Sequence, residues 1–213
     1  MDKRESNYEI MKHQMQTQFA AYDMDAVCRE WQLERKNGAP QLTLLDRRYW
    51  IDPQSGAVLW EKDGTVLEAD YNVSMTVFDL LTRSRQTASG EMTSINGLST
   101  VHTATAPTGG FFDRTARRFS NRCELLSAAC ERLGGVHYGK GDVAYMLPVF
   151  RDLQIAIQFW DCDDEFPPEL SFLCDKNILR FMYFETMMFL LCHVADRITE
   201  LCDEMEREGL NEH

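Results

Sequence analysis

The chain has 213 residues, of which 44% are hydrophobic and 26% are charged. This balance is typical of a globular protein and excludes both a wholly disordered chain and a small domain held together by disulfides. Acidic residues outnumber basic ones by 34 to 22, and the resulting net charge of −12 argues against a nucleic-acid partner. We expect a single domain over residues 1–213, with a disordered tail over residues 209–213.

The sequence favours a cytoplasmic protein with no membrane partner. Its most apolar segment, residues 181–194, contains Glu185 and His193 and is shorter than the roughly 20 apolar residues that cross a bilayer. The charged N-terminal residues are not followed by an apolar run, so no secretory signal is predicted. None of the seven cysteines lies in a C-x-x-C pair, which favours reduced thiols.

The N-terminal part of the chain predicts helices that flank a group of strands. Apolar residues recur every three to four positions over residues 8–21, as in an amphipathic helix, and Asp23 is a suitable N-cap for a short second helix. After a breaker at residues 36–40, alternating apolar residues over 41–60 predict a β-hairpin or small meander. A further helix is expected over residues 72–83.

The middle of the chain predicts a long loop followed by two helices. Residues 86–110 are rich in Ser, Thr and Gly and have few large apolar residues, so we expect an elaborate loop. Helices are expected over residues 111–119 and 121–133. The pair Gly134-Gly135 is a good stop for the second one.

The C-terminal part predicts an antiparallel sheet and a long helix. Residues 142–150 and 153–160 alternate between apolar and polar side chains, with room for only a tight turn between them, and residues 170–174 form a third strand. An amphipathic helix follows over residues 184–208. Together the elements predict an α+β fold: a central antiparallel sheet with a β-hairpin or meander, N-terminal helices, and a long C-terminal helix packed on one face.

The segment that leaves the second of these strands, Trp160 to Glu169, is the main candidate for chemistry. Four acids within five positions repel one another, so nearby groups should neutralise them or donate hydrogen bonds to them. One interpretation is a site for a hard divalent cation, completed by Asp175 and Glu185. The other is that the acids accept backbone N–H bonds in a turn and pair with arginines. The four acids are Asp161, Asp163, Asp164 and Glu165.

Other polar groups are weaker candidates. Residues 134–142 contain four glycines and a lysine that could surround an anion, but a helix stop followed by a turn is the simpler interpretation; His137 and Asp142 are the side chains to test there. On the last helix, Glu185 and His193 lie about 12 Å apart along one stripe, too far to share a metal. We expect His193 to be a packing residue.

One basic cluster has helical spacing within the otherwise acidic chain. It can form a local anion site or pair with nearby acids on a solvated face. Its members are Arg114, Arg117, Arg118 and Arg122.

Three blocks of residues carry a resemblance to a known family. They are Gly141-Asp-Val-Ala144, the run from Trp160 to Pro167, and Phe172-Leu-Cys-Asp175 with Glu185 downstream. Together they resemble a family of anaerobe proteins known as domain of unknown function family 3786, over about residues 8–197.

The resemblance bears on the site and on the function. In the family a Gly is common at the position of Cys162 and an aromatic residue at that of Cys174, so these cysteines are poor candidates for shared chemistry. Some relatives look to be fused to a four-cysteine iron–sulfur module like that of corrinoid-dependent one-carbon enzymes, a module that this chain lacks. The resemblance therefore implies a role in anaerobic cofactor metabolism and supports a site at the family's acids, Asp163, Glu165, Asp175 and Glu185.

Three functions remain open, and the sequence does not decide whether the protein is an enzyme. The first is a small-ligand or cofactor-binding accessory protein of anaerobic metabolism, whose ligand is a corrinoid or another tetrapyrrole in a pocket beside the acidic loop. Its candidate binding residues are Trp160, Asp163, Glu165, Asp175, Glu185, Asp142 and His137.

The second function is a metal-dependent hydrolase. In this hypothesis Asp163, Asp164, Glu165 and Asp175 hold a divalent cation that activates water. The third is a protein-interaction module, in which exposed Met and aromatic residues over 181–188 meet a protein partner or a second copy of the chain.

Overall fold

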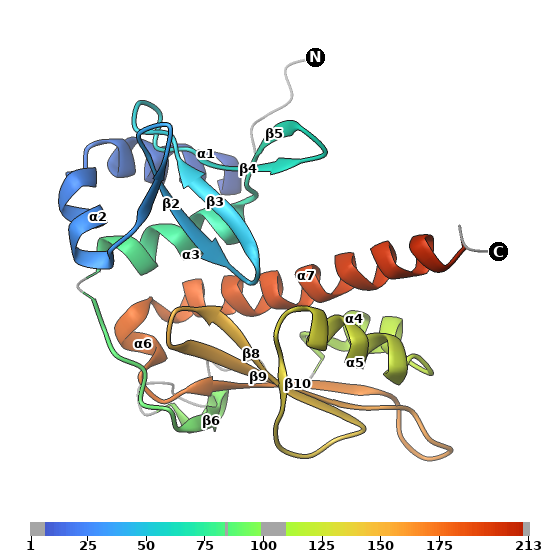
Figure 1. The fold of residues 1–213 in the computed structure, drawn as a ribbon. Helices are drawn as coiled ribbons and strands as arrows, with labels where there is room; N and C mark the ends of the chain where they lie inside the picture. The colour runs from blue at the N-terminus through green and yellow to red at the C-terminus, as the bar shows by residue number, and fades with distance from the viewer. Residues whose placement is uncertain (1–6, 84, 99–109, 211–213) are drawn as a thin grey trace. The chain divides into compact units, whose positions relative to one another are not determined.

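The computed structural model describes residues 7–83, 85–98 and 110–210. These residues form an α+β fold with two five-stranded antiparallel sheets and seven α-helices (Figure 1). The contacts divide the chain into two compact units: a first unit of Met1–Gln86 with Leu179–His193, and a second unit of Thr87–Ile178 with Val194–His213. The predicted fold class is confirmed, and the single-domain expectation stays a prediction.

Three helices of the first unit match the predicted ones closely. Asp23 caps the second helix by accepting hydrogen bonds from the backbone N–H groups of Asp25 and Ala26, each at 3.0 Å. Asp70 caps the third by accepting one from Val73 at 2.9 Å. These side chains satisfy N–H groups that have no partner inside the helix. The helices are α1 (Asn7–Ala20), α2 (Met24–Trp31) and α3 (Tyr71–Thr82).

The sheet of the first unit is a meander in which every strand pairs with its neighbour along the chain. Three of its four turns have two residues, and both residues have positive φ: Asn37-Gly38, Leu45-Asp46 and Asp63-Gly64. Such turns match the twist of antiparallel strands. The strands are β1 (Glu34–Lys36), β2 (Ala39–Leu44), β3 (Arg47–Ile51), β4 (Val58–Lys62) and β5 (Thr65–Glu68).

Within the described residues the meander pairs only with itself, so the predicted antiparallel sheet and the predicted meander are two separate sheets. In the second unit the strand order is β6-β10-β9-β8-β7. Two helices, α4 (Asp113–Phe119) and α5 (Cys123–Arg132), precede the long strands, and Gly134 has the positive φ of a helix stop. The strands are β6 (Met92–Ser94), β7 (Val136–His137), β8 (Val143–Phe150), β9 (Leu153–Trp160) and β10 (Glu169–Asp175).

The predicted loop over residues 86–110 contains an element that the sequence did not indicate. Strand β6 pairs with the end of β10, with Thr93 opposite Cys174, and a 3-10 turn, η1 (Ile95–Gly97), follows it. Residues 99–109 of that loop lie outside the described residues. The three residues of β6 have little strand propensity of their own. Their pairing with β10, far away in the chain, therefore makes them a strand.

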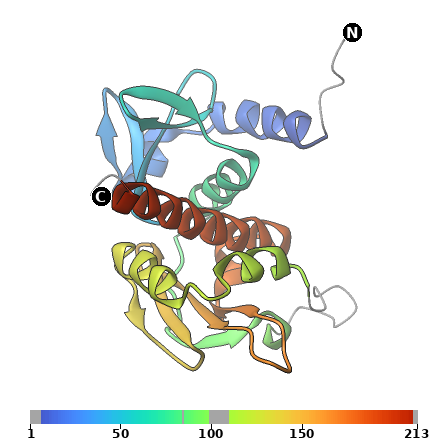
Figure 2. The ribbon, with the colours of Figure 1, turned by 90° about the vertical axis from the view of Figure 1, so that its right-hand side faces the viewer.

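A short helix, α6 (Ile178–Phe181), and one long helix, α7 (Phe184–Leu210), complete the chain. Helix α7 is uninterrupted (Figure 2), and it contributes residues up to His193 to the first unit and residues from Val194 to the second. Gly209 and Leu210 are still helical, and the rest of the predicted tail lies outside the described residues, so the tail stays a prediction. Within the described ranges, no helix combines the length and the apolar character needed to cross a membrane.

Candidate functional site

A cavity of about 1140 Å³ lies in the second unit, beside the end of β9 and the start of β10. Its volume slightly exceeds the roughly 300–1,000 Å³ of most small-molecule sites. Its described walls contain five aromatic and five acidic residues and no Lys, Arg or His. These ten are Phe111, Phe112, Trp160, Phe166, Phe172, Asp113, Asp142, Asp161, Asp163 and Glu169.

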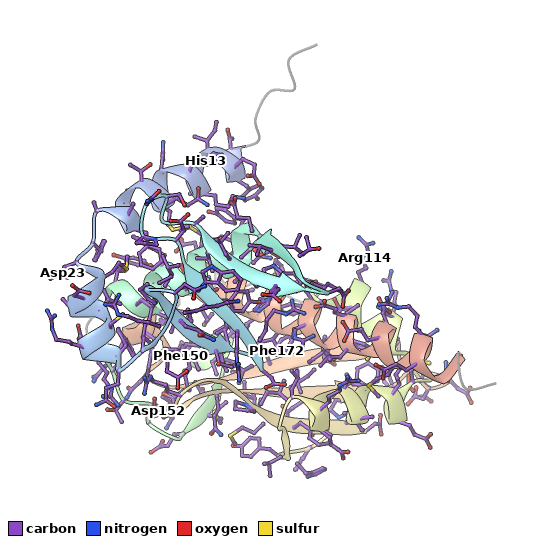
Figure 3. All side chains as sticks on the ribbon, turned by 45° about the horizontal axis from the view of Figure 1, so that its top comes forward. His13, Asp23, Arg114, Phe150, Asp152 and Phe172 are labelled. Atoms are coloured by element: carbon purple, nitrogen blue, oxygen red, sulfur yellow. The ribbon has the colours of Figure 1, made fainter. Side chains whose placement is uncertain are left out.

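The aromatic wall has a buried part and an exposed part. Phe112 packs edge-to-face on Phe172 with ring centroids 4.7 Å apart, and on Phe111 at 4.9 Å. Phe172 is almost fully buried in the sheet, where Figure 3 labels it. By contrast Phe111, Trp160 and Phe166 are 53%, 36% and 65% exposed. Three of the five aromatic residues of the cavity wall therefore expose surface to solvent.

Asp161 joins the end of β9 to the turn between α4 and α5. Its carboxylate accepts hydrogen bonds from the backbone N–H of Asn121 at 3.0 and 2.9 Å, and from that of Cys162 at 2.7 Å. The hydroxyl of Ser120 adds a bond of 3.2 Å. Burial raises the pKa of Asp161, but these hydrogen bonds outweigh burial and hold it below its ordinary value. Asp161 is thus an ionised structural acid.

Asp142 and Asp163 also accept main-chain hydrogen bonds. One oxygen of Asp142 accepts from the backbone N–H of Asp161 at 2.7 Å. One oxygen of Asp163 accepts from Glu165 and Phe166 at 2.8 and 2.7 Å, which closes a tight turn at the tip of the acidic loop. Those two hydrogen bonds lower the pKa of Asp163. In each residue the second oxygen has no such bond among the described residues.

Asp175 is buried, and its carboxylate accepts hydrogen bonds from the main chain. It accepts hydrogen bonds from the backbone N–H groups of Ser89, Gly90 and Asn177 at 2.7–3.0 Å, and from the hydroxyl of Ser89 at 2.9 Å. It lies at the end of β10, six positions and therefore about 20 Å along the strand from Glu169, where the acidic loop enters β10. The structure does not bring Asp175 to the acidic loop.

Trp160, Asp142 and Asp163 are the predicted binding residues that line the cavity. Asp164 and Glu165 are exposed on the same loop and do not line it. The exposed side chain of His137 lies in the short edge strand β7, with its ring 5.9 Å from that of Tyr145. Glu185 belongs to the first unit, at the start of α7.

The predicted four-carboxylate metal set is therefore divided. Asp163, Asp164 and Glu165 share one loop, whereas Asp175 is engaged elsewhere. Over residues 7–83, 85–98 and 110–210, no group of three or more His, Cys, Asp and Glu side chains is arranged to hold a metal ion. Hydrogen bonding to the main chain, the second of the two interpretations of the acidic segment, describes Asp161, Asp163 and Asp175.

Two acids of the cavity were not among the predicted site residues. Glu169, the first residue of β10, pairs across the strands with Trp160. Its carboxylate is exposed and makes no hydrogen bond or ion pair within the described residues. Asp113, in the first turn of α4, lies 4.0 Å from Arg117, and both side chains are largely exposed. The strand pairing of Glu169 with Trp160 is a signal that a register prediction could have used.

The thiol next to the cavity is not activated. Burial and a hydrogen bond from its S–H group to Asp161 raise the pKa of Cys123 to about 11. At neutral pH it therefore stays protonated, whereas a reactive cysteine needs its thiolate. All seven cysteines are free thiols, and four of them are buried.

Two other predicted surfaces have a structural role. In the predicted partner surface, Phe181, Met182, Met187 and Met188 are all at most 8% exposed, so the expected exposure is wrong; Tyr183 is the exposed one, at 63%. These four apolar side chains, on α6 and the start of α7, belong to the core of the first unit.

The basic cluster on α4 and at the start of α5 mostly pairs with acids, as one interpretation predicted. Arg118 pairs with Asp203, and Arg122 with Glu206 at 2.6 Å, which fastens these helices to the last turns of α7. Arg114 is exposed and points away from α4 (Figure 3). His193 is buried beside the Tyr49 hydroxyl at 3.5 Å, as expected for a packing residue.

Fold and cavity together define an α+β protein with an acidic, aromatic-walled cavity at the ends of two paired strands. The chain belongs to the family described as Domain of unknown function (DUF3786), whose model matches residues 23–197. The family predicted from the residue blocks is therefore confirmed, and the match begins at Asp23 rather than near residue 8. None of the curated proteins and none of the solved structures matches the chain.

Proposed function

We propose that this protein is a small-molecule-binding protein whose ligand or cofactor occupies the cavity beside β9 and β10. One observation carries the proposal: Phe111, Trp160 and Phe166 expose aromatic surface inside a hollow of about 1140 Å³. Large apolar side chains cost free energy when they face water, and a ligand that covers them recovers it. A concave, partly apolar site with a few polar groups is the usual form of a ligand pocket.

The acids favour a binding wall over a catalytic cation site. Asp142, Asp161 and Asp163 already use oxygens to hold the surrounding backbone, so they make the cavity rigid before any ligand arrives. A preformed wall reduces the entropy that is lost on binding. The hypothesis of a metal-dependent hydrolase lacks its fourth carboxylate ligand, because Asp175 is hydrogen-bonded at the other end of β10.

The family resemblance makes a corrinoid the first compound to test, within a role in anaerobic cofactor metabolism. The amide side chains of a corrinoid can donate hydrogen bonds to carboxylates. The propionates of haem would meet a wall that carries acids and, among its described residues, no cation to receive them. We therefore expect a corrinoid to bind in preference to haem.

The test is a spectrum followed by a titration. The protein is purified from an anaerobic host, its absorbance spectrum is recorded, and aquacobalamin and haem are then titrated by calorimetry. Trp160→Ala should weaken binding about tenfold or more, because stacking on an aromatic ring contributes roughly 1–3 kcal/mol. The matched control is Trp50→Ala in the first unit, which should leave affinity unchanged.

Two results would contradict this proposal. One is a colourless preparation that binds neither compound nor any member of a broader small-molecule panel. The other is unchanged affinity in Trp160→Ala, which would place the bound ligand elsewhere on the protein.

A further inference from the structure

The charge of the cavity wall is one-sided. Five of its described residues are acidic and none is basic. A cleft lined by one sign of charge concentrates the opposite sign and repels its own, and low-dielectric walls strengthen the effect. An anionic ligand would have to enter against this field, with no described wall residue to neutralise it.

The acids of the wall differ in what they can offer a ligand. Asp142 and Asp163 each have one oxygen engaged with a backbone N–H, and Asp161 has both engaged. Glu169 has neither oxygen engaged within the described residues, and Asp113 has only a distant, exposed arginine at 4.0 Å. Glu169 and Asp113 are thus the carboxylates that can turn both oxygens to a ligand.

Strand pairing places the carboxylate of Glu169 beside the ring of Trp160. Glu169 and Trp160 are directly opposite each other in the β9–β10 ladder, so their side chains leave the same face. Directly opposite residues have Cβ atoms about 5 Å apart. The face of a Trp ring attracts cations more strongly than that of any other side chain, and a carboxylate next to it adds a full negative charge.

We infer that the ligand in this cavity is an organic cation with a flat apolar body, whose charge lies between Glu169 and the ring of Trp160. The inference rests on the proposed function and narrows it to one ligand class. Phe111 and Phe166 cover the apolar body, and Asp113 contributes further negative charge from α4.

Three probes of matched shape test the charge requirement. They are (3-hydroxyphenyl)trimethylammonium, its uncharged isostere 3-tert-butylphenol, and the anion 3-hydroxybenzenesulfonate, each titrated into the full-length protein by saturation-transfer NMR. The cation should bind about tenfold or more tightly than the uncharged probe, since a partly desolvated cation–π contact has roughly that effect. The anion should not bind, and added salt should weaken the binding of the cationic probe but not that of the uncharged one.

The variants locate the charge. Glu169→Gln should lower the affinity for the cationic probe about tenfold and leave the affinity for 3-tert-butylphenol unchanged. Glu165→Gln is the matched control: it removes the same charge from an exposed position on the loop before β10 that does not line the cavity, and it should change neither affinity.

Each adverse result has its own meaning. If the uncharged or anionic probe binds as tightly as the cation, the inference is overturned while the binding cavity stands. If Glu169→Gln keeps the affinity of the wild type, or if Glu165→Gln loses as much, the charge does not act at Glu169 and the inference is overturned. If none of the probes binds, and aquacobalamin and haem do not bind either, the proposed function fails with it.

Discussion

The backbone N–H of Asn121 donates to both carboxylate oxygens of Asp161, with N···O distances of 3.0 and 2.9 Å. Asn121 has a φ of 58°, a left-handed conformation that costs free energy for most residues. The carboxylate stabilises the turn in which that conformation occurs. One side chain thereby connects the strand that ends at the cavity with the two helices beside it.

Asp161→Asn should destabilise the protein without unfolding it. The amide keeps one acceptor oxygen but turns an NH₂ group toward N–H donors, so hydrogen bonds to a charged group are lost. We expect the free energy of unfolding to fall by about 1–3 kcal/mol, measured by urea denaturation. Asp164→Asn, an exposed acid on the same loop, should leave the midpoint unchanged. Equal midpoints for both variants would show that the Asn121 bond has no net effect.

The effect of Asp161 should disappear in acid. Its pKa in the folded protein is lowered, so the unfolded chain, with an Asp pKa of about 3.9, binds the proton more readily. The stabilisation by the carboxylate is then complete above about pH 4 and is lost as pH falls through the lowered pKa. The difference in unfolding free energy between wild type and Asp161→Asn should therefore be full at pH 6 and shrink at lower pH. A difference that grows as the pH falls would contradict this sign.

Asp175→Asn should be the most harmful of these substitutions, and it should act on stability. Asp175 is 1% exposed and accepts four hydrogen bonds from Ser89, Gly90 and Asn177. An amide keeps one acceptor oxygen and turns an NH₂ group toward the donors of the other, so hydrogen bonds to a buried carboxylate are lost. We expect a loss of about 3 kcal/mol or more in thermal or urea unfolding. At a temperature where the variant is folded, its affinity for any cavity ligand should equal that of the wild type. A loss of metal or ligand binding without a loss of stability would contradict this and would show that Asp175 belongs to the site.

Asp46→Gly should stabilise the first unit. Leu45 and Asp46 form a two-residue turn with φ values of 49° and 57°, and glycine adopts that conformation without strain. Leu45 is buried and has to keep its side chain, whereas Asp46 is exposed. We expect a gain of about 0.5–1 kcal/mol in the free energy of unfolding. Asp46→Ala also removes the charge but keeps a Cβ, so it should be less stable than Asp46→Gly; the reverse order would exclude the backbone explanation.

Most elements could be predicted because their signals are local. The alternation over residues 143–160 predicts two strands, and the two positions Arg151 and Asp152 between them leave room only for a tight turn, as found. The first sheet was predicted incompletely. Residues 36–40 were interpreted as a breaker, although Asn37-Gly38 is a strong hairpin signal, because strand β1 before it has only three residues. Strand β6 could not be predicted, since its partner lies some eighty positions further on.

The sequence indicated the segment that borders the cavity, but not all of the side chains that line it. The Trp160 segment does border a cavity, since Trp160 and Asp163 line it. Whether Asp161 and Asp175 bind a cation or accept main-chain hydrogen bonds could not be decided, because their donors come from distant turns: Asn121 for Asp161 and Ser89 for Asp175. Glu169 was overlooked because only strand pairing places it beside Trp160.

The two sheets differ in how much of the chain each needs before it can form. The meander pairs neighbours only, so its strand pairing needs no residue beyond Glu68. The other sheet has to wait for β10, because β6 has no partner until Cys174 lies opposite Thr93. During synthesis the cavity should therefore be among the last features to form, and a chain that stalls before residue 169 would carry paired meander strands and no complete cavity.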